Sequence, residues 1–214
     1  LMDCGSGALM SLEHHLDPFL LDGVILSHYH YDHIADLGVL QYYRQLHPHE
    51  NKKELPIYGH LLDEPHFKEL TLENVSYGVG YEEGKTLEVG PFSIEFLKTK
   101  HPVVCYAFKI TEKKTGKILT FTGDTGYFPQ LETFIAGSHV LLADTYLFQG
   151  HENHQAHLTS FEAGKIAKNT GVEKLILTHL PQLGDLSQLQ EEAQKVAGEK
   201  CLVVLAQKDL AINI

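Results

Sequence analysis

Residues 24–34 of the chain read Val-Ile-Leu-Ser-His-Tyr-His-Tyr-Asp-His-Ile. The first three residues are apolar, two of them are β-branched, and the fourth is a small serine. This composition is typical of a buried strand. Residues two apart at the end of a strand point to the same side, so His28 and His30 can reach one metal ion together. Asp32 and His33 lie past the turn, at the start of a predicted helix, where they can bind a second ion.

The chemistry of this segment favours a divalent metal. Imidazole and carboxylate ligands suit zinc and comparable divalent ions, and the segment contains no thiolate. The alternative is a His-rich turn whose rings are solvated or hydrogen-bonded. Three histidines and one aspartate within the six residues 28–33, directly after an apolar strand, favour the metal site.

Three further candidate ligands also lie next to predicted strands. His101 precedes the run 103–110, Asp124 follows 117–122, and His179 follows 175–178. An α/β scaffold places its functional groups in such positions. Taken singly each of these residues fits an ordinary loop, but together with the first cluster they supply enough ligands for two metal ions and an open position for water.

These residues resemble a known family in their order along the chain. The motif His28-x-His30-x-Asp32-His33, followed by His101, Gly123-Asp124 and Thr178-His179, strongly resembles the metallo-β-lactamase superfamily over essentially the whole chain. The resemblance implies an α/β fold, a four-layer αββα sandwich with two metal ions at one edge of its sheets. It assigns His28, His30 and His101 to the first ion, Asp32, His33 and His179 to the second, and Asp124 to a bridge between them. The ions are expected to be zinc, with manganese as the other choice.

A second segment narrows the resemblance to one branch of the superfamily. Residues 157–182 look like ribonuclease Z and related phosphodiesterases, in which a histidine and a small hydroxyl residue precede a helix, a glycine, a strand and a final Thr-His. The similarity implies that His157 acts as a general acid or holds the phosphoryl oxygens, and that Asp144 orients it. The reaction is then attack on phosphorus by a hydroxide that bridges the two metal ions, with Asp32 among the residues that assemble this centre. The alternative for His157 is a ring in solvent at the helix start.

Two features separate this chain from ribonuclease Z itself. Ribonuclease Z carries a long, basic, Gly-rich arm between the residues that match His101 and Asp124, whereas this interval holds only two predicted strands and the turn Glu-Lys-Lys-Thr-Gly-Lys. With 17 Lys and Arg against 28 Asp and Glu, the formal net charge is −11, so no general basic field attracts nucleic acid. The expected substrates are therefore RNA ends or small and cyclic phosphodiesters.

The rest of the chain predicts one mixed α/β domain over residues 1–214, and the resemblance implies that its first strands are missing at the N-terminus. Helices are expected at 33–46, 63–71, 159–169 and 186–197, the third with a Thr159/Glu162 capping box and a stop at Gly171. Strands are expected at 24–27, 56–59, 93–97, 103–110, 117–122, 139–145, 175–178, 201–206 and 210–214.

Other functions remain open at this stage. The same metals could hydrolyse a thioester, lactone or β-lactam, since a fold does not determine its substrate. The chain could also be a metal-bound but inactive binding subunit, although the complete ligand set speaks against this. The three dispersed cysteines, and the lack of a signal peptide or of a run of roughly 18 apolar residues, lead us to expect a cytoplasmic protein without a membrane role. The resemblance also implies a homodimer.

Overall fold

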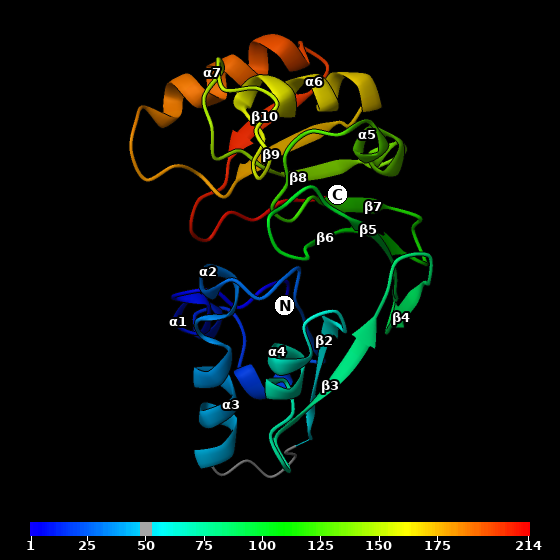
Figure 1. Cartoon of the computed structure of the whole chain (residues 1–214), viewed down its shortest axis with the longest axis vertical. Coiled ribbons are helices and arrows are strands. Elements are labelled where there is room, and N and C mark those ends of the chain that lie inside the picture. Colours follow the sequence, from blue (N-terminus) through cyan, green and yellow to red (C-terminus); the bar gives the residue numbers. More distant parts are fainter. Residues whose placement is uncertain (48–52) are drawn as a thin grey trace. The chain divides into compact units, whose positions relative to one another are not determined.

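The residues before the His-rich motif form β1 (Val24–Ile25), the first strand of a parallel sheet in the computed structural model, which describes residues 1–47 and 53–214. The sheet continues with β2 (Leu55–His60) and β3 (Ser76–Tyr81), both labelled in Figure 1, and its strand order is β1-β2-β3. Met2 pairs with Ile25 in a parallel bridge, so the start of the chain runs beside β1. The carboxyl ends of the parallel strands share one edge, and β1 enters the His-rich motif there.

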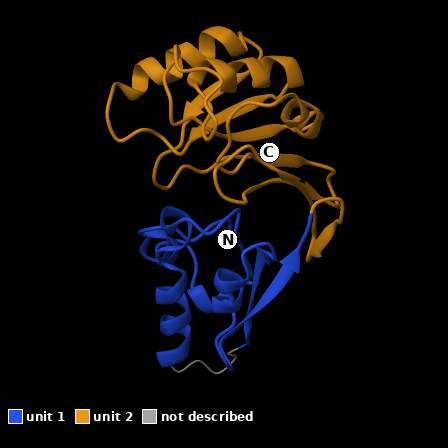
Figure 2. Cartoon of the chain, in the orientation of Figure 1, with its two compact units in different colours: residues 1–82 blue, residues 83–214 orange. Residues whose placement is uncertain are grey.

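This sheet belongs to the first of two compact units, residues 1–82 and 83–214 (Figure 2). The first unit also contains α1 (Ala8–Glu13), a short 3₁₀ turn (Pro18–Leu20), α2 (Tyr31–Ile34), α3 (Leu37–Leu46) and α4 (Glu64–Glu69). Its core packs Leu26 and Leu40 with Ile57. The single domain expected from the sequence stays a prediction.

The second unit is built on a sheet of seven strands, in the order β10-β9-β8-β7-β6-β5-β4 (Figure 1). The strands are β4 (Leu87–Val89), β5 (Phe92–Lys98), β6 (Tyr106–Glu112), β7 (Ile118–Phe121), β8 (Val140–Asp144), β9 (Lys174–Thr178) and β10 (Leu202–Leu205). Neighbouring strands are antiparallel from β4 to β7 and parallel from β7 to β10. The carboxyl ends of β8 and β9 therefore lie at one edge, which is where Asp144 and His179 occur.

Helices α5 (Pro129–Ile135), α6 (Ser160–Thr170) and α7 (Leu186–Ala197) complete this unit, and α6 and α7 pack on its parallel strands. The buried side chains between them include Leu141, Ile166 and Leu177. The capping box predicted for the third helix is confirmed, since the Thr159 and Glu162 side chains each bond the other's backbone. Gly171 ends the helix at φ 71°, a left-handed conformation that glycine adopts without strain.

Several predicted elements are wrong in detail. The helix expected over 33–46 is interrupted between α2 and α3, because Asp36 bonds outside the helix, accepting from Leu9 N–H and donating to the Cys4 carbonyl. The strand expected over 103–110 begins only at Tyr106, and 210–214 forms no strand although its composition is apolar. Strands β3 and β4 and helices α1 and α5 were not predicted. In β3 the two glycines conceal the strand pattern, since glycine is rare in strands.

The backbone of Gly5 lies directly against the backbone of Asp32, and this contact holds the start of the chain against the His-rich motif. A Cβ atom at Gly5 would overlap the carbonyl oxygen of Asp32, and the neighbouring Cys4 N–H donates to the His33 carbonyl at 2.7 Å. We expect Gly5→Ala to lower the free energy of unfolding by roughly 1–3 kcal/mol because the backbone must shift. Gly38→Ala is the matched control in denaturant unfolding, because nothing lies within 4 Å of its Cβ position. Equal stability of both variants would contradict the close-packing argument.

None of the helices in the described part of the chain has the length and apolar character needed to cross a lipid bilayer.

Candidate metal centre

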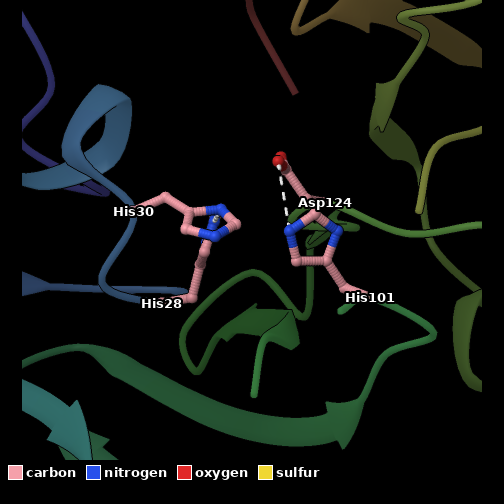
Figure 3. Close-up of side chains that lie close together, drawn as sticks. All are labelled: His28, His30, His101 and Asp124. Atoms are coloured by element: carbon pink, nitrogen blue, oxygen red, sulfur yellow. Dashed lines mark hydrogen bonds and ion pairs between the residues drawn. The ribbon is translucent and has the colours of Figure 1, made fainter. Parts of the chain in front are cut away.

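The first unit brings together the candidate ligands of the His-rich motif. Figure 3 shows the His28 and His30 rings next to each other, and their Nε2 and Nδ1 atoms are 3.0 Å apart. Two imidazole nitrogens on one tetrahedral zinc ion lie about 3.3 Å apart, so this spacing fits a shared ion. Past the turn, Asp32 Oδ2 lies 3.6 Å from His33 Nε2. The Asp32 side chain is 62% exposed, whereas His33 is buried.

Asp3 connects these ligands, and sequence reasoning missed it. Its Oδ1 accepts from Ser27 N–H at 2.7 Å, and its Oδ2 accepts from Ser27 Oγ at 2.8 Å and from His33 Nδ1 at 2.7 Å. Asp3 adopts φ 49°, an unusual conformation for a residue other than glycine. The available signal was a carboxylate directly after a short apolar run, the same pattern that selected Asp124.

The hydrogen bonds around Asp3 determine which ring nitrogen carries the proton. A carboxylate only accepts, so His33 donates from Nδ1 and keeps Nε2 as its basic nitrogen. Ser27 gives its single hydroxyl proton to Asp3, so its oxygen accepts from His28 Nδ1 at 3.0 Å. His28 therefore also keeps Nε2 as its basic nitrogen. This is the tautomer of a histidine that binds a metal ion through Nε2.

The second unit gathers ligands around Asp124, a buried residue that follows β7. Asp124 Oδ2 lies 4.0 Å from His101 Nε2, as drawn in Figure 3, and 3.4 Å from His179 Nε2. His101 donates from Nδ1 to the Ala156 carbonyl at 3.1 Å, so its basic nitrogen also faces the carboxylate. His179 follows β9 at φ 51°, a strained conformation of the kind found at functional sites.

Asp144 ends β8 and forms a second group with His157 and His179. It is fully buried, and its Oδ2 accepts from His157 Nδ1 and from Thr125 N–H, both at 2.9 Å. Its Oδ1 lies 3.5 Å from His179 Nδ1. The structure thus places Asp144 beside His157, as the sequence predicts, while the catalytic role of this pair stays a prediction.

The loop that carries His157 is held by its own side chains. His154 Nδ1 accepts from the backbone N–H groups of Ala156 and His157, both at 3.2 Å. Glu162 accepts from Asn153 N–H at 2.9 Å and from Thr159 N–H at 3.0 Å. These bonds fix both ends of the loop, so the His157 ring is pre-positioned against Asp144.

Two other titratable groups near the motif are kept neutral. Burial, together with the nearby Asp36 and Asp3 carboxylates, raises the pKa of the Cys4 thiol to about 12. Burial also raises the pKa of Tyr29, whose hydroxyl donates to the His60 carbonyl at 2.8 Å. Cys4 is therefore a neutral thiol at neutral pH, and the Tyr29 hydroxyl holds the His60 carbonyl.

The donor set within each unit fits a divalent metal ion. His28, His33 and His101 each donate from Nδ1 to an oxygen acceptor, which leaves Nε2 for coordination. The accompanying ligands are carboxylates, and imidazole with carboxylate suits zinc, manganese and similar ions.

Comparison with known proteins agrees with this chemistry. Residues 1–180 match the family described as Beta-lactamase superfamily domain. The chain is 41% identical over 199 residues to the "Probable metallo-hydrolase YhfI" of Bacillus subtilis, covering 92% of this chain and 81% of that protein. The crystal structure of the metallo-beta-lactamase fold protein YhfI superposes with a TM-score of 0.91 at 38% identity, over 97% of this chain and 84% of that one.

More distant matches include a ribonuclease Z and a diphosphatase. A ribonuclease Z of Thermoplasma acidophilum is 24% identical over 257 residues, covering 91% of this chain and 81% of that protein. A diphosphatase from the PhnP family shares the fold, with a TM-score of 0.73 at 16% identity over 100% of this chain and 79% of that one. The α/β fold of metallo-β-lactamase type expected from the sequence is confirmed. The chain belongs to the metallo-β-lactamase superfamily of metal-dependent hydrolases.

Proposed function

We propose that the protein is a phosphodiesterase that acts with two divalent metal ions. His28, His30 and His101 would hold the first ion, Asp32, His33 and His179 the second, and Asp124 would bridge them. The proposal rests on the family, on the Nδ1 contacts within each unit and on the likeness to ribonuclease Z. Zinc is the first choice for both positions, and manganese the second.

The observation that carries the phosphodiesterase assignment is the contact between His157 and Asp144. A metal centre alone suits many hydrolases, whereas an ester with a poor leaving group also needs a proton donor. His157 Nδ1 lies 2.9 Å from the buried Asp144 carboxylate. Asp144 thus holds the ring in one orientation and offsets the positive charge of its protonated form.

The metal ions and the His157 and Asp144 side chains have different tasks in the proposed reaction. When bound, two divalent ions activate a water molecule as the nucleophile and polarise the phosphoryl oxygen. His157 carries a proton on Nε2 and gives it to the leaving oxygen, while its Nδ1 proton remains on the hydrogen bond to Asp144. The loop bonds from His154 and Glu162 keep the ring in place during this transfer.

The substrates we propose are RNA ends or small and cyclic phosphodiesters. The interval between His101 and Asp124 holds only β6, β7 and the turn that joins them, too short for a separate RNA-binding arm. The formal net charge of −11 weakens long-range attraction of a polyanion. A homodimer is part of the proposal on grounds of family resemblance alone.

The test is hydrolysis of bis(p-nitrophenyl) phosphate by the purified protein. We expect activity that disappears after chelation and returns on addition of zinc or manganese. An Asp124→Ala variant, purified identically, should show no metal-restored activity, which excludes a contaminating phosphodiesterase. A fully metal-loaded wild-type protein without activity would contradict the proposal, and thioesters, lactones and β-lactams would then be assayed.

A further inference from the structure

Tyr146 is an exposed aromatic residue beside the His157 and Asp144 pair. It lies two residues after Asp144, and its N–H donates to Asp144 Oδ1 at 3.2 Å. The same carboxylate therefore positions the Tyr146 backbone and the His157 ring. Large aromatic side chains are usually well buried, yet 41% of the Tyr146 surface is exposed.

The ring of Tyr146 contacts two other rings of the second unit. Its centroid is 5.1 Å from that of His157, at an interplanar angle of 48°, and 5.5 Å from that of His179, at 49°. The His157 and His179 rings stack on each other at 5.0 Å and 16°. Tyr146 is thus supported by both histidines while part of its surface stays open for a ligand.

The chemistry of the surroundings narrows what this open surface can bind. The contacts described for the two histidine rings also include Asp124, Asp144, His101 and His154. None of these four residues is a lysine or an arginine. A ligand held at its phosphate by metal ions would gain further affinity here through a flat, apolar group on Tyr146.

We propose that Tyr146 is the platform on which a nucleobase stacks, so that the site selects nucleoside phosphate esters. This inference rests on the proposed phosphodiesterase function and names its substrate class. Stacking a base on an aromatic side chain typically contributes enough free energy for a roughly 5- to 150-fold gain in affinity. The expected preference for a nucleotide over the matching sugar phosphate is of this size.

The experiment measures binding by calorimetry with zinc-loaded protein, so that it does not depend on turnover. The two probes are adenosine 5′-monophosphate and ribose 5-phosphate, which share the sugar and phosphate and differ in the base. Wild-type protein should bind the nucleotide roughly 5- to 150-fold more tightly. Tyr146→Leu should bring the two affinities close together, whereas Tyr146→Phe, which keeps the ring, should retain the preference.

The control is Tyr42→Ala, which removes an exposed tyrosine on α3 and should leave the preference unchanged. Equal binding of both probes by wild-type protein overturns the inference even if Tyr146→Leu fails to fold. A Phe variant as weak as the Leu variant also overturns it, because the hydroxyl would then be responsible. Failure of the phosphodiesterase proposal is recognised separately, by absent hydrolysis in the metal-loaded protein.

Discussion

Replacing His157 with alanine is expected to lower kcat for phosphodiester hydrolysis by roughly 10²–10⁴-fold while the bound metal stays in place. The reason is that the leaving oxygen loses its proton donor, whereas none of the ligands proposed for the two ions is changed. His157 contacts the buried Asp144 through Nδ1 at 2.9 Å, which leaves Nε2 for the substrate. KM should change less than kcat, since the proton is transferred in the transition state.

The measurement combines steady-state kinetics on a phosphodiester with a poor, alkoxide leaving group with metal analysis of the same preparation. His151→Ala is the matched control. His151 is an exposed histidine that precedes the same loop, and the hydrogen bond described for its ring is to the Phe148 carbonyl, at 3.4 Å. We expect near wild-type kinetics for this control. Loss of metal from the His157 variant would instead identify His157 as a ligand, and unchanged activity would remove it from the mechanism.

Replacing Asp3 with asparagine is expected to weaken metal affinity by roughly 10–100-fold, although the two side chains have almost the same shape. Asp3 accepts three hydrogen bonds, from Ser27 N–H, Ser27 Oγ and His33 Nδ1. An amide NH₂ in either orientation faces at least one of these donors. With the NH₂ at the Oδ2 position, His33 is pushed toward the tautomer with its proton on Nε2, the atom that should bind the metal. With the NH₂ at the Oδ1 position, Ser27 N–H loses its acceptor and the arrangement around His33 is weakened.

Competition for zinc with a chromophoric chelator measures this affinity. Asp22→Asn, an exposed aspartate of the same unit, is the control and should bind zinc like the wild type. Denaturant unfolding of both metal-free proteins separates a general loss of stability from a specific loss of affinity. Wild-type zinc affinity in a folded Asp3→Asn protein would show that Asp3 does not set the His33 tautomer.

The sequence predicted those structural features best that depend on residues close together in the chain. The capping box at Thr159 and Glu162 and the stop at Gly171 involve residues within one helix, and both are present as predicted. The break between α2 and α3 was not predictable in this way. It depends on Asp36 bonding Leu9, which lies 27 residues earlier in the chain.

The candidate site shows the same division. His28, His30, Asp32 and His33, and the strand ends at His101, Asp124 and His179, were predicted from local patterns, because the strand period and the end of an apolar run can be read from adjacent residues. The sequence also determined the family through the order of these motifs.

Only the tertiary structure decided how the ligands are oriented. The partner of His33 is Asp3, 30 residues away, and the partner of His101 is the Ala156 carbonyl, 55 residues away. The exposed ring of Tyr146 against His157 and His179 is likewise a product of the sheet order. Such contacts form between strand ends and loops that meet only after the chain folds, so no local pattern encodes the proton position of a ligand or the surface offered to a substrate.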